Sequence, residues 1–354
     1  MTFDEARALF PVLERFAYLN AGTCGPLSRG TAEAMAEEER RELESGRSGL
    51  EYVERALAIR AEARAVVGAL VGADPSAVAV TASTTDGCNI VLAGLGVTPG
   101  DEVITTTDEH FALLGPLHAS GARVVVAPPD PDAILAAVTP RTRLLALSQV
   151  LWTTGEILPV RELRERSGRP ILVDGAQSVG AVPVDAAGFD FLTISGQKWL
   201  CGPNGAGALV VAEPERLRIA RPSYFAQSSY EEDGTFEPRE GAVRFEPNWT
   251  AVPTLVGWLA AMRQVPEWAH ARAFELAERL RGMLAGCVEV LTPQERATLV
   301  SFRPPPGDEA AAVVARLADA GVVVRDLPGR ELVRASVGWW TSEDDLDRLV
   351  SALG

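Results

Sequence analysis

The chain has 354 residues, of which 47% are hydrophobic and 23% are charged, an ordinary composition for a soluble globular protein with a large core. Its net charge of −15 and the lack of a basic stripe argue against a surface for nucleic acid or anionic membranes. The four cysteines lack zinc or disulfide spacing, and there is neither a secretion leader nor a run of about 18 apolar residues, so we expect a cytoplasmic protein without a metal site.

The first two thirds of the chain predict a large α/β domain. Residues 28–46 and 50–71 carry apolar residues at helical spacing. Seven short apolar runs then alternate with possible helices, at 77–81, 102–106, 123–127, 144–149, 170–174, 189–195 and 208–212. This alternation indicates a mainly parallel seven-stranded sheet with helices on both faces, and we assign it to residues 15–245.

The last third predicts a smaller α+β domain. Residues 219–250 lack periodicity and indicate loops, whereas residues 252 to about 286 predict a long helical stretch. The further expected elements are a strand at 298–302, a helix at 308–320, a hairpin-like pair at 322–325 and 332–336, and a helix at 342–353. We expect residues 1–14 and 246–354 to form this second domain.

Lys198 is the most informative residue, because it is the only lysine among 33 basic residues. An arginine guanidinium stays protonated, whereas a lysine amine can become neutral and form a Schiff base with an aldehyde. The setting Ser195-Gly196-Gln197-Lys198-Trp199 is apolar and glycine-rich. It favours a covalent anchor for pyridoxal phosphate over a surface lysine without a role.

Other candidate residues follow predicted strands, where open α/β sheets hold ligands. Thr84 and Thr85 begin a helix and could bind a phosphate, although Ser and Thr are also common helix caps. Asp174 could cap a helix or pair with a protonated pyridine nitrogen, and Gln177 could then bond to the phenolic oxygen of the ring. His110 could be a packed loop histidine, or it could stack on the ring and assist proton transfer.

Together these segments resemble the class V aminotransferase family of fold-type I pyridoxal phosphate enzymes. This family includes cysteine desulfurases, cystine/cysteine C–S lyases, kynureninases and an epimerase branch. The resemblance runs from Tyr18 to Glu343 and rests on motifs in the family's order: the Thr-Thr turn, Glu-His, Trp-Thr-Thr-Gly, Asp-Gly-Ala-Gln, Ser-Gly-x-Lys-Trp, Arg-Phe-Glu and Val-Arg-Ala-Ser. It implies the fold-type I architecture, pyridoxal phosphate as cofactor and a homodimer with shared active sites.

The resemblance also implies roles for individual residues. The catalytic groups would be Lys198, His110 and Asp174. The cofactor would be bound by Thr84, Thr85, His110, Asp174, Gln177, Ser195, Gln197 and Lys198, with Thr250 reaching the phosphate of the neighbouring subunit. The substrate would meet Arg334 through its carboxylate, and also Arg325, Gln149, Trp152, Asn20 and Gly22. Two positions depart from the family, which often has histidine in place of Gln197 and asparagine or histidine in place of Gln149.

The small domain distinguishes between the reactions of the family. A desulfurase needs a cysteine on a mobile loop there, but no cysteine occurs from Val288 to Gly354, and the loop is shortened to residues 326–330. The short turn would place Arg325 and Arg334 on neighbouring limbs of a hairpin, where they could clamp one carboxylate or both carboxylates of cystine. Arg325 could instead be a solvated turn residue.

Within the family, the cysteine-free hairpin, the opening segment Tyr18–Leu27 and the Trp-Leu-Cys-Gly-Pro run most resemble the cystine/cysteine C–S lyases and the cysteine desulfurase-like branch. This resemblance implies a C–S lyase that acts on a cysteine- or cystine-like amino acid by β-elimination and releases pyruvate, ammonia and a sulfur product. The alternatives are a class V aminotransferase or epimerase acting on another small amino acid, and a desulfurase with a relocated nucleophile. Cys24, in the loop 20–27, is the candidate for that nucleophile. A cofactor-binding sensor without turnover is a further alternative.

Overall fold

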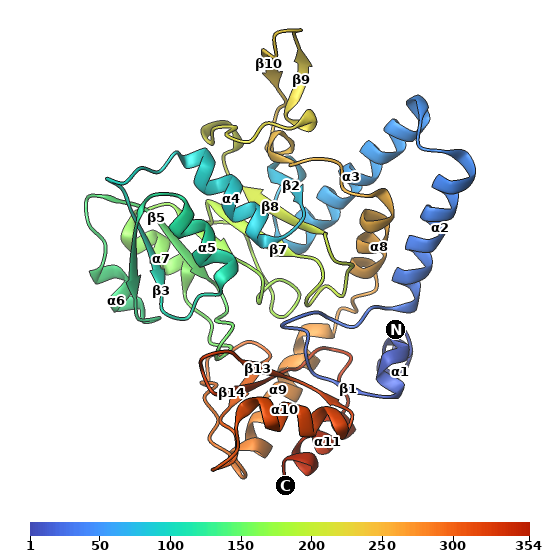
Figure 1. Cartoon of the computed structure of the whole chain (residues 1–354), viewed down its shortest axis with the longest axis vertical. Helices are drawn as coiled ribbons and strands as arrows, with labels where there is room; N and C mark the ends of the chain where they lie inside the picture. The colour runs from blue at the N-terminus through green and yellow to red at the C-terminus, as the bar shows by residue number, and fades with distance from the viewer.

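A seven-stranded sheet forms the centre of the larger part of the structure, which is a computed structural model that describes residues 1–354 (Figure 1). The spatial order of the strands is β2-β8-β7-β6-β5-β3-β4. Their bounds are β2 (Val78–Thr81), β3 (Glu102–Thr106), β4 (Arg123–Ala127), β5 (Thr142–Ser148), β6 (Ile171–Asp174), β7 (Phe191–Ser195) and β8 (Gly207–Val211). The strand β8 runs opposite to the other six, so its pairings with β2 and β7 are antiparallel and the rest are parallel. The predicted mainly parallel sheet of seven strands is confirmed.

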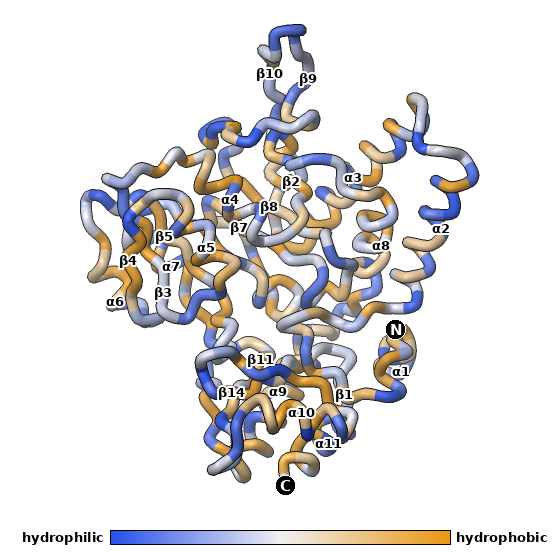
Figure 2. Tube along the Cα trace, in the orientation of Figure 1, coloured by the Kyte–Doolittle hydropathy of each residue, from blue (hydrophilic) through white to orange (hydrophobic).

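The strands are apolar throughout because both faces of the sheet are covered. Alternate residues of one strand enter different hydrophobic clusters: Leu145 and Leu147 join one, and Leu144 and Ala146 join the other. The first cluster includes side chains of α3 (Gly49–Val71), α6 (Pro131–Ala136), α7 (Val160–Ser167) and α8 (Val252–Arg263). The second includes side chains of α4 (Thr84–Leu95) and α5 (Phe111–Ala119). In the hydropathy-coloured trace, apolar segments alternate with hydrophilic ones along the helices (Figure 2).

Helix α2 (Arg29–Ser45) packs against α8 at one side of the sheet. Its first turn is capped by Ser28, whose Oγ accepts a hydrogen bond from the backbone N–H of Thr31 at 3.0 Å. The helical stretch expected over about 252–286 is divided into two helices. The chain forms α8 and then α9 (Ala269–Ala285), and the break contains Pro266, which lacks the N–H that a continuous helix requires.

The smaller part is built from a three-stranded antiparallel sheet of order β11-β14-β13 and the helices that cover it. Its elements are α9, β11 (Leu299–Phe302), α10 (Ala310–Asp319), β12 (Val322–Val323), β13 (Arg325–Leu327), β14 (Leu332–Ser336) and α11 (Glu343–Leu353). The predicted hairpin pair, 322–325 with 332–336, was wrong in its first strand. The strand β13 pairs with β14, whereas β12 pairs in parallel with β1 (Ala17–Tyr18), which follows the N-terminal helix α1 (Phe3–Arg7).

Packing supports domain limits that differ from those expected from the sequence. Ala17 and Leu19 lie in the core of the smaller part, together with side chains of α9, α10 and α11. Trp258 of α8 lies in the core of the larger part. We therefore propose that the larger domain spans about residues 20–263 and that both chain ends belong to the smaller one.

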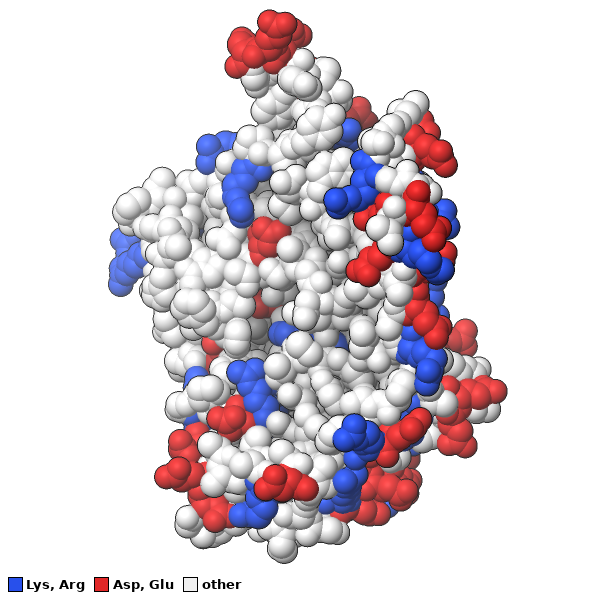
Figure 3. Space-filling view, turned by 45° about the vertical axis from the view of Figure 1, so that its right-hand side comes forward, with Lys and Arg blue, Asp and Glu red and all other residues white.

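A two-stranded hairpin of β9 (Gln227–Tyr230) and β10 (Phe236–Pro238) projects from the larger part (Figure 1). Its tip carries Glu231, Glu232 and Asp233, all exposed, and acidic atoms cluster at this end of the molecule (Figure 3). None of the helices combines the length and apolar character that crossing a bilayer would require.

Candidate active site

Lys198 lies in the turn that follows β7 and is half-buried. The loop 20–25 packs directly against this turn, because the backbone N–H of Gly25 donates to the carbonyl oxygen of Gln197 at 2.8 Å. A Cβ at Gly25 would come within 2.2 Å of the Lys198 carbonyl oxygen, so only glycine allows this approach. Desolvation lowers the pKa of the Lys198 amine to about 8; Asp174 opposes the shift and Arg334 adds to it. About a tenth of the amine is therefore neutral at pH 7, far more than for an exposed lysine.

Asp174 is the last residue of β6 and is buried. Its Oδ1 accepts a hydrogen bond from the backbone N–H of Ala176 at 2.9 Å. Desolvation raises the pKa of this carboxyl, whereas nearby Lys198 lowers it. No arginine neutralises Asp174, so its carboxylate is available to a protonated ring nitrogen.

His110 precedes the first residue of α5 and caps that helix. Its Nδ1 accepts a hydrogen bond from the backbone N–H of Ala112 at 3.1 Å, which assigns the ring proton to Nε2. The ring packs edge-on against Trp152, with 5.1 Å between centroids. Desolvation, followed by the charges of Lys198 and Arg325, lowers the pKa of His110 to about 4. The imidazole is therefore neutral at physiological pH and offers an Nε2–H donor.

Gln177 joins the loop 20–25 to the lysine turn. Its Nε2 donates to the carbonyl oxygen of Gly22 at 2.9 Å, and its Oε1 accepts from the indole N–H of Trp199 at 3.0 Å. One amide hydrogen is left for the predicted contact with a phenolic oxygen. The bridging bonds were not predicted, since they depend on a loop 155 residues away.

The predicted phosphate ligands lie at neighbouring strand ends. Thr84 and Thr85 are the first two residues of α4, and the helix is capped by Ser83. The strands bring this helix start close to Ser195, because Gly207 pairs with Ser195 and a Cβ at Gly207 would lie 3.2 Å from the Ser83 nitrogen. Helix N-termini attract anions, so this edge suits a phosphate.

Of two further predicted phosphate ligands, Gln197 lies near the lysine turn and Thr250 does not. Gln197 lies beside Ser195, whose Oγ donates to Gln197 Oε1 at 2.8 Å. Thr250 lies apart from them, just before α8, in a hollow that it lines with Ser48 and Tyr52 near the connection between α2 and α3. Within one chain the structure does not bring Thr250 to Lys198.

Arg334 and Arg325 face one another on neighbouring strands, in register between β14 and β13. Arg334 is fully buried; its Nη1 donates to the carbonyl oxygen of Trp152 at 2.9 Å, while Nε and Nη2 have no partner. Desolvation, and then Arg325, lower the pKa of Arg334 to about 9. Neither arginine forms an ion pair with a carboxylate of the chain, so the pair is prepared for an anion from outside.

The remaining predicted substrate contacts surround Arg334. A Cβ at Gly22 would lie 2.6 Å from Arg334 Nη2, so the guanidinium fills the space beside this glycine. Asn20 pairs with Ser336 of β14 and accepts a hydrogen bond from the hydroxyl of Thr23 at 2.8 Å. The Oε1 atom of Gln149 and the indole nitrogen of Trp152 are buried without partners. These unpaired polar atoms suit a polar ligand.

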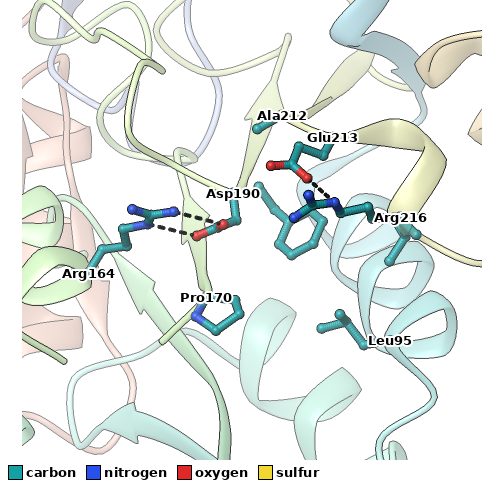
Figure 4. A pocket seen from close by; sticks show the side chains of 9 residues that line it. Leu95, Arg164, Pro170, Asp190, Ala212, Glu213 and Arg216 are labelled. Carbon is teal, nitrogen blue, oxygen red and sulfur yellow. Dashed lines mark hydrogen bonds and ion pairs between the residues drawn. The ribbon is translucent and has the colours of Figure 1, made fainter. Parts of the chain in front are cut away.

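A cavity of about 230 Å³ elsewhere is a poor candidate site (Figure 4). Its lining residues include Pro170 and Asp190, which precede β6 and β7, so it opens at the sheet edge opposite Asp174 and Lys198. The charged side chains lining it are already paired, Arg164 with Asp190 and Arg216 with Glu213. No charge is left there to recruit a ligand.

Two residues at the site were missed from the sequence. Glu109 is buried immediately before His110, and its place in a Glu-His pair was the available signal. Arg330, in the turn between β13 and β14, donates to the carbonyl oxygen of Thr107 at 2.7 Å, and its guanidinium lies 2.8 Å from Asp108. No pattern in the sequence indicated this contact between the two parts of the molecule.

Comparison with known proteins identifies relatives that belong to one family of enzymes. Residues 18–349 match the family model described as Aminotransferase class-V. Isopenicillin N epimerase from Streptomyces clavuligerus is 30% identical over 99% of this chain and 97% of the relative. A probable cysteine desulfurase from Pseudomonas aeruginosa is 32% identical over 79% of this chain and 78% of the relative.

The solved structures similar to this chain include C-DES, described as a cystine C–S lyase in complex with its reaction product cysteine persulfide. It superposes with a TM-score of 0.90 at 27% identity, over 97% of this chain and 98% of the other. A mutant of C-DES with glycine covalently linked to the pyridoxal phosphate cofactor gives a TM-score of 0.91 at 27% identity, over 98% of each chain.

Proposed function

The chain belongs to the class V aminotransferase family, and we propose that within this family it is a C–S lyase. It is an enzyme whose cofactor is pyridoxal phosphate. The proposed reaction is β-elimination from a cysteine- or cystine-like amino acid, which yields pyruvate, ammonia and a sulfur product. The observation that carries the proposal is the β13–β14 hairpin, which has two arginines without counter-ions and no cysteine.

The residues at the site fit the cofactor. Lys198 has a lowered pKa, Asp174 is a buried carboxyl without an arginine partner, and α4 presents its N-terminus at the same sheet edge. We assign the ring nitrogen to Asp174, the phosphate to Thr84, Thr85, Ser195 and Gln197, and the covalent bond to Lys198. When bound, pyridoxal phosphate supplies an electron sink for the bond that is broken at the substrate α-carbon.

The chain's own residues would then perform four tasks. Arg334 and Arg325 bind a carboxylate and so fix which substituent of the α-carbon faces Lys198. The Lys198 Nζ takes the α-proton and can return a proton to the leaving sulfur. Asp174 holds negative charge against the ring nitrogen. Trp152 and the loop 20–25 cover the site and limit the access of water.

Epimerisation is the second candidate, and the isopenicillin N epimerase relative supports it. It needs a proton returned to the α-carbon from the face opposite the lysine. His110 is neutral, with a pKa of about 4, and is therefore a weak acid for this step near neutral pH. We place elimination first for this reason.

We also propose that the enzyme is a homodimer with shared active sites. The position of Thr250, away from Lys198 within its own chain, supports this arrangement, because the residue could contact cofactor only in a second subunit. Trp249 beside it is 43% exposed and Tyr224 is 60% exposed, an apolar surface suited to a partner.

A substrate panel tests the proposed reaction. The purified enzyme would be given cysteine, cystine, cysteine sulfoxides and simple amino acids, and assayed for pyruvate, sulfide, transamination products and change of chirality. We expect pyruvate and ammonia in equal amounts from cystine or a related β-substituted amino acid. Alanine as the main product from cysteine, or racemised amino acid without pyruvate, would refute the lyase proposal.

A further inference from the structure

Glu109 is a buried carboxyl that the proposed reaction leaves without a role. Its side chain is 4% exposed, and no arginine or lysine lies within ion-pair distance of it. Buried carboxyls without a cation are rare because desolvation opposes their charge. The position of Glu109, between β3 and the helix cap His110, therefore requires an explanation.

Three donors converge on this carboxyl from two strand ends. Oε1 accepts from the hydroxyl of Thr106 at 3.1 Å and from the backbone N–H of Ser148 at 2.9 Å. Oε2 accepts from the hydroxyl of Ser148 at 2.5 Å. Thr106 ends β3 and Ser148 ends β5, so the carboxyl fixes the loop that carries His110 to the end of the next strand.

The same contacts place the carboxyl beside the catalytic centre. Ser148 is paired in register with Asp174 of the adjacent strand β6. The two carboxyls are therefore held on either side of Ser148, and the negative charge of Asp174 acts on Glu109.

We propose that Glu109 is a positioning residue that fixes His110 and sets the charge around Asp174. The proposal rests on the roles proposed above for His110 and Asp174, but it does not depend on whether the reaction is elimination or epimerisation. Fixing the loop requires only hydrogen-bond acceptors, which an amide could partly supply. The carboxyl adds a proton that can be held or released beside Asp174.

The electrostatics agree with this geometry. Desolvation, followed by the charge of Asp174, raises the pKa of Glu109 to about 7. Cys88 on α4 also faces these carboxyls, and its own burial raises the pKa of its thiol, so it stays neutral. The titratable groups around Glu109 are thus Asp174, Cys88 and His110, and none of them is a cation at neutral pH. Release of the Glu109 proton would strengthen the negative field that acts on Asp174 and Lys198.

The test compares Glu109→Gln with a matched control, Glu102→Gln. Glu102 is also a buried glutamate, but it begins β3 at the opposite sheet edge and pairs with Arg141 and Arg123. For each holoenzyme we would measure the visible absorption of the bound cofactor against pH, kcat and KM, and thermal unfolding. In the wild type we expect the absorption to change near pH 7, where Glu109 titrates. In Glu109→Gln this transition should be absent and kcat should fall about tenfold, with KM changed less than about threefold. The control should lose stability but keep the transition and kcat.

A second variant separates the two parts of the role. Ser148→Ala removes one hydrogen bond but keeps the Glu109 carboxyl, so kcat should fall while the transition remains and moves to higher pH, because the Ser148 hydroxyl lowers the pKa of Glu109. A Glu109→Gln enzyme with the wild-type transition and kcat would overturn the proposal. Equal effects in Glu109→Gln and Glu102→Gln would also overturn it, because they would mean a merely structural role. Failure to trap cofactor on wild-type Lys198 with borohydride would instead refute the site assignments on which the proposal rests.

Discussion

At the scale of single residues, Lys198 combines properties that a Schiff-base lysine needs. Its amine is kept partly neutral by desolvation, with a pKa of about 8, and it is backed by Asp174. The surrounding basic residues are all arginines, which cannot replace it. Among the basic side chains, Lys198 is therefore the one that can form a Schiff base with an aldehyde.

Reduction with borohydride should fix the cofactor to Lys198 covalently. We expect the purified enzyme to be yellow and to carry one pyridoxyl group after reduction, which mass spectrometry of peptides would locate. The Lys198→Ala variant serves as the control and should carry none. A pyridoxyl group elsewhere, or none in the wild type, would contradict the assignment.

The two facing arginines should differ in importance. Arg334→Ala removes one partner of a desolvated charge pair, so it should cost about 2–5 kcal/mol of productive substrate binding, measured through kcat/KM, while cofactor remains bound. Arg325→Ala should have a smaller effect on cysteine and a larger one on cystine, which has a second carboxylate. Arg303→Ala is a control, because Arg303 is half exposed and pairs with Glu289 away from the site. Small, equal losses in all three variants would rule out the clamp.

Glu109 should also make the stability depend on pH. Its folded-state pKa of about 7 lies above the ordinary value of 4.5, so the folded protein keeps a proton that the unfolded chain releases. The associated stability is complete below about pH 4.5 and is lost as the pH rises through about 7, up to about 3 kcal/mol. The Gln side chain of Glu109→Gln stays neutral at every pH. Between about pH 4.5 and 7, the free energy of unfolding of the wild type in urea should therefore fall relative to that of the variant. A difference independent of pH would contradict the raised pKa.

At the scale of elements, the strands could be predicted because burial on both faces makes them continuously apolar. Candidate ligands could be predicted where they follow those strands, as Asp174 and Ser195 do. The pairing of β1 with β12 could not be predicted, since two-residue strands carry no pattern and their partners are about 300 residues apart. The contact of Glu109 with Ser148 could not be predicted either, because the two residues are 39 positions apart in the sequence. Pro266 is a sequence feature that indicates the break after α8, but the helical pattern on both sides of it favoured a continuous helical stretch.

The turn between β13 and β14 should help to hold the small domain over the site, through its contact with the loop 107–110 of the larger part. Arg330 joins this turn to Thr107 and Asp108, in the loop that also carries His110. Because Arg330 is 40% exposed, its ion pair is worth only about 0–1 kcal/mol. Arg330→Ala should therefore raise KM by roughly fivefold or less and leave kcat within about twofold. Hydrogen exchange of the turn should become faster; unchanged exchange would show that other contacts hold it.

At the scale of the whole molecule, both parts of the chain contribute to one site. The larger part supplies Lys198, Asp174 and His110, and the smaller part supplies the arginines. The sheet places the first three at neighbouring strand ends, and the N-terminal segment that carries β1 continues into the loop 20–25 over the lysine. The site is therefore sensitive to how the two parts are held together.

The assembly should be a dimer in solution. Light scattering should give about twice the mass of the 37.7 kDa chain. Thr250→Ala should weaken retention of the cofactor if the residue contacts the phosphate of the other subunit. A fully active monomer would exclude shared sites.

The single lysine has a practical consequence for work with the enzyme. A lysine-specific endoprotease has one cleavage site in the unfolded chain, after Lys198, and would yield residues 1–198 and 199–354 as two fragments. Once cofactor is fixed on that side chain, the protease no longer recognises it. The fraction of chain that resists cutting, read from a denaturing gel, would then count the occupied active sites directly.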